Sequence, residues 1–282
     1  MITSVLPFSG HIYHQGCIRE NIIFTSLYIV QLLVLNVLVI IIKFSVPGLF
    51  HRAILLSGSA LSSWALVEDP VEFAVRLARH VNCSVPEDLY REHELIVDCL
   101  RDVPLADLMA ADITAPAFLS AFGPSVDGVV IKTDFHEELW SNLIPEMPSF
   151  ASQQSMNYDL LFGVVTSESL WKFSSNDIQA GFEGERRDKI IRTYVRNAYT
   201  YHLSEIFFTV VNEYTDWERT VLHPINTRDA TVAALSDAQF VAPVVATGDL
   251  LSKPLHSSSP KTHRSFFYVF DYQTKDGDYP QV

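Results

Sequence analysis

The sequence predicts an α/β fold, with a doubly wound, mostly parallel sheet flanked by helices. Three short apolar runs rich in β-branched and aromatic residues have the length of strands, and longer segments with helical spacing lie between them. Apolar runs without polar alternation are typical of parallel strands that are buried on both faces. A chain of 282 residues with 48% hydrophobic content is long enough for one or two buried cores.

The three predicted strands are residues 49–57, 160–165 and 266–272. A Ser-Gly-Ser turn ends the first strand, and a loop rich in Ser, Pro and His, residues 252–265, leads into the last. Residues 133–156 are rich in Pro, Ser and Gln, which predicts an exposed loop.

Helical spacing predicts five helical segments. The first begins after Asp69 with Pro70 in its first turn, a favourable start for a helix. Glu185 and Lys189 have the i,i+4 spacing that supports a helix, and Pro243 is expected to interrupt the last segment. The five segments are residues 69–81, 87–101, 104–112, 182–214 and 228–251.

The net charge of −13 argues against a nucleic-acid partner, because phosphates attract Lys and Arg. Solubility is the simplest explanation of this charge. We find no internal repeat and no linker between domains.

Residues 1–46 differ in composition from the predicted domain at 47–282. Residues 22–42 carry no charge and are almost entirely apolar, which is long enough to span a bilayer. No small-x-small cleavage pattern follows, so a signal anchor is favoured over a cleaved signal peptide. An intron end translated as protein would produce a similar apolar run, and this alternative stays open.

Several motifs carry a family resemblance. The segment from Gly48 to Trp64, GLFHRAILLSGSALSSW, resembles the cholinesterase-like (type-B carboxylesterase) α/β-hydrolases just past their catalytic serine. Within that superfamily, SGSALSSWA resembles the neuroligins, and residues 181–187 resemble an arthropod member. Further matches are Asn82-Cys83, VDCLR at 97–101, AFGPSVDG at 121–128, Asn157-Tyr158-Asp159, YTDW at 214–217 and FYVF at 267–270. The resemblance implies a partial α/β-hydrolase fold with less than half of the family domain.

The same resemblance implies that the chain is not an enzyme. No G-x-S-x-G nucleophile motif occurs in the sequence, and no histidine lies where the family has its base. Glu168 follows the strand 160–165, at the place of the family's triad acid, and is interpreted as a relic of that acid. The competing hypothesis is a fragment of an active serine carboxylesterase.

The resemblance also implies a disulfide between Cys83 and Cys99, which leaves Cys17 unpaired. Two free thiols in a reducing compartment are the alternative. Asn82-Cys83-Ser84 is formally a glycosylation sequon, but its middle residue would be held in the disulfide, which disfavours glycosylation at Asn82.

The partner implied by the resemblance is a neurexin-type protein at the synaptic cell surface, bound around a calcium ion. Met156, Asn157 and Asp159 match the family's contact stretch, and their oxygen donors suit calcium. An acidic contact of the family is missing, since residues 152–155 are Ser-Gln-Gln-Ser. The simpler alternative for Asn157 and Asp159 is a role in turn geometry. A homodimer is expected in the full-length parent, and no other cofactor is expected.

Overall fold

The computed structural model describes residues 52–128, 131, 133, 159–218, 223–252 and 264–272. The predicted leader 1–46, its apolar segment 22–42 and nearly all of the predicted loop 133–156 lie outside these residues.

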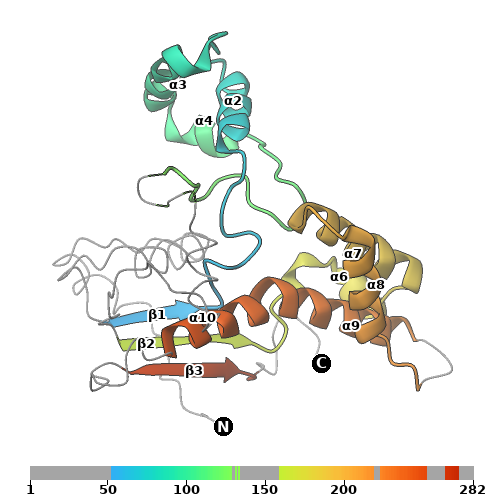
Figure 1. Cartoon of the computed structure of the whole chain (residues 1–282). Coiled ribbons are helices and arrows are strands. Elements are labelled where there is room, and N and C mark those ends of the chain that lie inside the picture. Colours follow the sequence, from blue (N-terminus) through green and yellow to red (C-terminus); the bar gives the residue numbers. More distant parts are fainter. Residues whose placement is uncertain are drawn as a thin grey trace.

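A three-stranded parallel sheet forms the base of the described structure (Figure 1). Its strands are β1 (Arg52–Leu56), β2 (Asp159–Val165) and β3 (Ser265–Phe270), in the order β1-β2-β3. Leu55 pairs with Phe162, and Phe162 pairs with Phe267. The predicted α/β class and parallel sheet are therefore confirmed.

One face of the sheet packs against helix α10 (Ala242–Ser252). Leu160, Phe162 and Val164 point to this face and are buried. A Cβ atom at Gly248 would lie 2.9 Å from the ring of Phe162, so this glycine lets α10 approach β2 closely. The opposite face carries side chains that are 36–55% exposed: Ile54, Leu56, Leu161, Val165, Phe266 and Phe270. Within the described residues, the coverage of both faces expected of a doubly wound sheet is thus not seen.

Beyond the carboxyl ends of the strands lies a group of helices (Figure 1). It comprises α6 (Ser175–Ala180), α7 (Gly184–Ala198), α8 (Leu203–Glu213) and α9 (Pro224–Ser236). Its core is a cluster of buried side chains: Ile191, Tyr194, Val195, Phe207 and Leu235. The single helical pattern predicted at 182–214 is in fact two helices, because the chain reverses at residues 199–202, where His202 has a left-handed φ of 55°.

The helix α9 continues into α10 through a π-helical turn at Asp237–Val241, in which the Ala242 N–H donates to the carbonyl of Asp237. Pro243 therefore does not break the helix as the sequence predicted. The length and composition of Pro224–Asp249 would allow it to cross a bilayer. However, 56% of its most apolar 18-residue window is buried in the fold. This burial is typical of a core helix.

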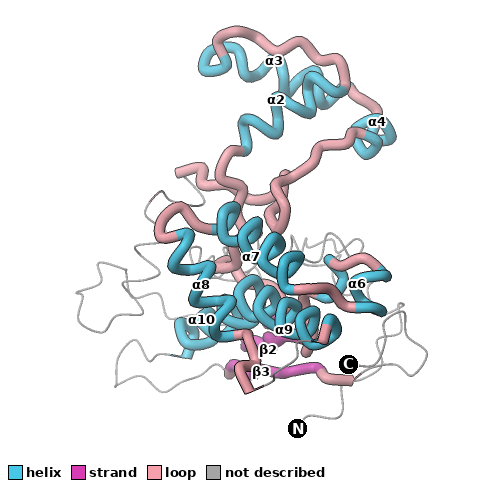
Figure 2. The backbone as a smooth tube through the Cα atoms, turned by 90° about the vertical axis from the view of Figure 1, so that its right-hand side faces the viewer, coloured by secondary structure: helices cyan, strands magenta, loops and turns pink. Residues whose placement is uncertain are grey.

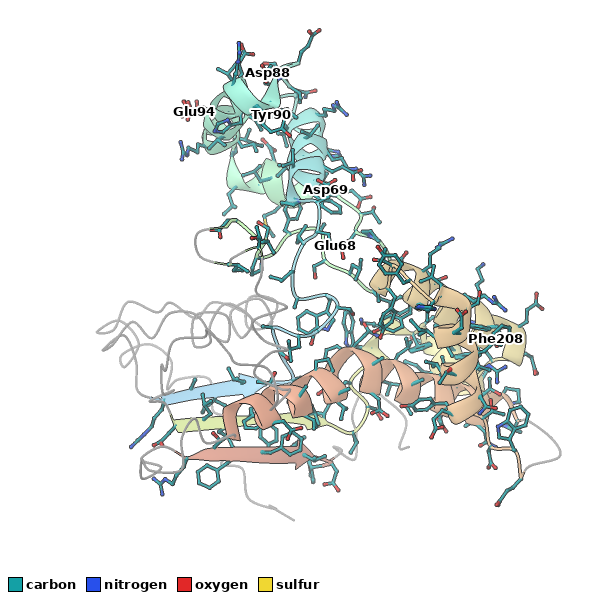
Figure 3. All side chains as sticks on the ribbon, in the orientation of Figure 1. Glu68, Asp69, Asp88, Tyr90, Glu94 and Phe208 are labelled. Carbon is teal, nitrogen blue, oxygen red and sulfur yellow. A yellow bond between two sulfur atoms is a disulfide. The ribbon has the colours of Figure 1, made fainter. Side chains whose placement is uncertain are left out.

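Three helices form an excursion between β1 and β2 that stands away from the sheet (Figures 1 and 2). They are α2 (Pro70–His80), α3 (Leu89–Asp102) and α4 (Leu105–Ala110). Asp69 caps α2 by accepting from the Glu72 N–H at 3.1 Å, and the excursion has its own small core of Ala78, Cys83 and Ile96. Figure 3 labels acidic residues of this region, namely Glu68, Asp69, Asp88 and Glu94, together with Tyr90, which is 97% exposed.

Candidate functional site

Glu168 lies in the turn after β2, at the edge of the sheet where the carboxyl ends of the parallel strands meet. The residue is buried, with 7% of its surface exposed. One carboxylate oxygen, Oε1, accepts from the backbone N–H of Val165 at 2.8 Å. Burial raises the pKa of Glu168, although hydrogen bonds from Ser57 and Val165 act in the opposite direction.

Each of the other two strands adds a hydroxyl near this carboxyl group. Ser57, just past β1, adopts a left-handed φ of 58°, and its N–H donates to the carbonyl of Gly163 at 2.9 Å. The Ser57 side chain then reaches Glu168. On β3, burial and the nearby charge of Glu168 raise the pKa of Tyr268 to about 12. The sequence placed Glu168 at a strand end, but Ser57 and Tyr268 were missed as its neighbours because their proximity depends on the strand order.

The remaining hydroxyl of the Ser-Gly-Ser turn serves packing. Ser59 is fully buried, and its Oγ donates to the carbonyl of Pro243 at 3.1 Å and contacts Thr247 Oγ1 at 2.8 Å. These bonds tie the chain after β1 to helix α10. Because these bonds hold the Ser59 hydroxyl in place, it is not presented to a substrate. This agrees with the interpretation of Ser-Gly-Ser as a turn that ends the first strand.

No histidine in the described part of the chain hydrogen-bonds to Glu168. His202 and His223 sit at the starts of α8 and α9, and His223 Nδ1 accepts from the Ile225 N–H at 3.2 Å. His256 and His263 lie outside the described residues.

Asp159 lies at the opposite, amino-terminal edge of the sheet, where β2 begins. Its Oδ1 accepts from the Arg264 N–H at 3.0 Å, and its Oδ2 lies 3.5 Å from Arg52 Nε. Asp159 therefore connects the starts of all three strands. Met156 and Asn157 lie outside the described residues, so the predicted calcium site stays a prediction. No group of three or more His, Cys, Asp or Glu suited to a metal ion occurs among the residues that are described.

The parallel sheet with its flanking helices agrees with a comparison of the whole chain against known families. Residues 34–282 match the family model described as the Carboxylesterase family. The chain belongs to this family. The match begins inside the predicted apolar segment 22–42, and the predicted domain boundary at residue 47 stays a prediction.

Several curated proteins are similar to this chain. Neuroligin-1 of Caenorhabditis elegans is 34% identical over 241 residues, which are 81% of this chain and 28% of that protein. Neuroligin-3 of Mus musculus is 34% identical over 229 residues, 79% of this chain and 24% of the relative. Neuroligin-2 of Homo sapiens is 32% identical over 209 residues, with 72% and 23% covered. The chain thus spans about a quarter of the length of these relatives.

The disulfide implied by the resemblance is present in this carboxylesterase-family chain. Cys83 and Cys99 are bonded with their Cα atoms 6.0 Å apart, and they join the end of α2 to α3. Cys17 lies outside the described residues.

Asn82, exposed beside this disulfide, ends helix α2. Its φ is 61°, its N–H donates to the carbonyl of Arg79 at 3.3 Å, and the next N–H, that of Cys83, donates to Ala78 at 2.8 Å. This pair of bonds is a Schellman motif, in which Asn tolerates the left-handed position. The structure thus assigns Asn82 a role in helix termination.

Proposed function

We propose that this chain is part of a catalytically inactive, cholinesterase-like adhesion domain of a neuroligin-like protein at the synaptic cell surface. The observation that carries the proposal is the similarity to neuroligins over 72–81% of the chain. Family membership alone does not separate adhesion from esterase activity, so the contacts of Glu168 supply the second argument.

An esterase of this fold needs an activated nucleophile whose base is oriented by the acid. Glu168 instead accepts from the Val165 N–H and interacts with Ser57. These contacts support a structural role for its carboxyl group. The competing candidate is a piece of an active carboxylesterase, which is favoured by the buried position of Glu168 at the carboxyl edge.

Hydrolysis of p-nitrophenyl acetate by the purified full-length parent separates the two candidates. We expect no turnover above a buffer control. Turnover that is abolished in proportion to an added serine-reactive phosphonate would establish an esterase and overturn the proposal.

For adhesion, we propose that Met156, Asn157 and Asp159 contribute to calcium-dependent binding of a neurexin-type partner in the full-length parent. Asp159 alone is an incomplete calcium site, because one oxygen accepts from Arg264 and the other faces Arg52. Further oxygen ligands have to come from the neighbouring residues and from the partner.

Two substitutions in the full-length parent test this assignment. Asp159→Ala should weaken calcium-dependent binding to an immobilised neurexin-type ectodomain, whereas Arg52→Ala removes the ion pair and keeps the carboxylate. Unchanged affinity in Asp159→Ala, or an equal loss in both variants, would show that the Asp159 carboxylate does not contact the ion.

The proposal includes the plasma membrane as the location, with residues 22–42 as an anchor, and a homodimer of the parent. Surface biotinylation of cells that express the parent, followed by sedimentation of its ectodomain, tests both. An intracellular protein or a monomeric ectodomain would contradict these two parts.

A further inference from the structure

Tyr90 is the most exposed aromatic side chain among the described residues, with 97% of its surface accessible. It is the second residue of α3, on the excursion that stands away from the sheet (Figure 3). Within the described part of the chain, its hydroxyl has no hydrogen-bond partner. The phenol is therefore accessible to the active site of a second protein.

Carboxylates surround this tyrosine in the sequence. Four of them lie within four residues of it and are exposed: Glu87, Asp88, Glu92 and Glu94. Residues 68–112, which include α2, α3 and α4, hold eleven Asp and Glu against four Arg, a net charge of −7. About half of the chain's net charge of −13 thus lies on the excursion, and it attracts positively charged binding surfaces.

The backbone around Tyr90 can open without disturbing the rest of α3. Glu92 departs from helical geometry, with φ −117° and ψ 17°, so a kink separates the first turn from the remainder of the helix. Asp88 holds this turn, since its Oδ1 accepts from the Tyr90 N–H at 3.1 Å and from the Arg91 N–H at 3.3 Å. An exposed terminal turn with few bonds opens at low cost, so this segment can fit the active site of a modifying enzyme.

The disulfide indicates which enzymes the excursion meets. Cys83 and Cys99 are 16 residues apart, and Tyr90 lies near the middle of the loop that they close. Disulfides form and persist in oxidising compartments such as the lumen of the secretory pathway. The inference below rests on the secretory route of the proposed function, which this bond supports, and is independent of the adhesion partner.

We propose that Tyr90 is a tyrosine sulfation site, modified in the secretory pathway by a sulfotransferase that uses a nucleotide phosphosulfate. The phenol oxygen attacks the sulfur of the donor, and an O–S bond forms as the bond from sulfur to the phosphate oxygen breaks. The nucleotide leaves, and the phenol proton passes to a base of the transferase. Sulfur keeps its oxidation state, so no oxidant or reductant takes part.

Charge makes Tyr90 a suitable acceptor. A transferase active site that binds a polyanionic donor must itself be positively charged, and a tyrosine flanked by carboxylates complements it. A tyrosine in a neutral or basic segment lacks this attraction, and a tyrosine with a hydrogen-bonded hydroxyl is less available for attack.

Two other tyrosines separate these requirements within the same molecule. Tyr201 is 78% exposed, but Glu205 is the only acidic residue within five positions of it. Tyr214 has Glu213, Asp216 and Glu218 nearby, but its hydroxyl donates to Asp237 at 2.6 Å. Only Tyr90 among these three combines full exposure with an acidic segment.

The test uses the full-length parent, secreted or displayed by cells grown with radioactive sulfate. Peptide mapping by mass spectrometry should find sulfate on the peptide with Tyr90 and none on those with Tyr201 and Tyr214. A purified tyrosylprotein sulfotransferase with a nucleotide phosphosulfate donor should add sulfate at the same position in parent protein made with chlorate, which blocks synthesis of the donor in cells.

Two variants of the parent sharpen the test. Y90F keeps the ring and should lose the label at this position. The double variant E92Q and E94Q keeps the hydroxyl, and its sulfation by the purified enzyme should slow by roughly tenfold because two attractive charges are gone. An unchanged rate in the double variant would contradict the role given to the carboxylates.

Tyr90 without sulfate in both arms, in protein whose Cys83–Cys99 bond is intact, would overturn this proposal alone. Free thiols at both cysteines would overturn it together with the cell-surface location. Phosphate in place of sulfate, recognised because a phosphatase removes it, or equal labelling of Tyr90 and Tyr201 would also overturn it.

Discussion

The indole N–H of Trp64 donates to the backbone carbonyl of Gln239 at 3.1 Å, across 175 residues of sequence. In an uninterrupted α-helix this carbonyl would accept from the N–H of residue 243, but that residue is proline and has none. The indole therefore supplies the missing donor, and its ring packs on Phe240 with the centroids 5.5 Å apart. Trp64 thus provides a hydrogen bond to a backbone carbonyl within the π-helical turn that joins α9 to α10.

The Trp64→Phe substitution keeps most of the ring and removes the donor. We expect a loss of about 1–2 kcal/mol in the free energy of unfolding, because a backbone carbonyl is left without its partner. Urea unfolding followed by circular dichroism measures it. Trp171→Phe is the matched control, since Trp171 is 55% exposed, and it should change stability little. Equal effects in the two variants would contradict the role given to the indole N–H.

The Gly163→Ala substitution should prevent close pairing of β2 with β3. A Cβ atom there would lie 2.1 Å from the carbonyl oxygen of Tyr268 and 2.5 Å from its ring. We expect destabilisation of about 3 kcal/mol or more, which Tyr268→Ala should not rescue because the nearest atom belongs to the backbone. In Gly184→Ala, the control, the nearest atom would be 3.6 Å away. Thermal unfolding of the three variants checks this, and a stable Gly163→Ala protein would argue against the register.

The pH dependence of stability should reveal the buried carboxyl group. The pKa of Glu168 is raised in the folded state above its ordinary value of 4.5, mainly by burial. Between these two pKa values the folded chain holds more protons than the unfolded chain, so this group makes stability fall as the pH rises. Glu168→Gln stays neutral, and its stability relative to the wild type should increase from pH 4 to pH 7 in urea titrations. A constant difference across this range would contradict a raised pKa.

Helix termination at Asn82 can be tested by hydrogen exchange at the Cys83 amide, which donates to Ala78. Asn82→Ala should speed this exchange and destabilise the excursion by about 1 kcal/mol, because alanine resists a left-handed backbone. Asn82→Gly adopts the same φ without strain and should protect the amide at least as well as Asn does. The protein should be made without glycosylation, so that loss of the sequon plays no part. Faster exchange in Asn82→Gly than in Asn82→Ala would be the contrary result.

The sequence predicted the strands well and the helix ends less well. A short apolar run marks a buried strand wherever it pairs, so the run at 160–165 differs from β2 by one residue at its start. Helical spacing continues across the reversal at residues 199–202, so α7 and α8 looked like one helix. Pro243 indicated a break because the residue that supports the helix there, Trp64, lies in a distant segment.

The candidate site, too, could be predicted from the sequence only in part. Glu168 could be located from the residues around it, because a turn after a parallel strand lies at the carboxyl edge. Its neighbours Ser57 and Tyr268 could not, because they come from strands whose order is a property of the folded sheet. The contacts of Lys172 with the rings of Phe118 and Phe240 could not be predicted either, because these two residues are distant from Lys172 in the sequence.

The pairing of β1 with β2 has a consequence for biosynthesis. The two strands are hydrogen-bonded neighbours, yet the whole α2–α4 excursion separates them in the sequence. At a translation rate of about 5–20 residues per second, a ribosome needs on the order of 5–20 s to make the roughly one hundred residues between them. During that interval the apolar residues of β1 have left the ribosome while their partner strand does not yet exist. Strand β1 therefore stays without this partner for the whole interval, and deletions that shorten the excursion would shorten the wait.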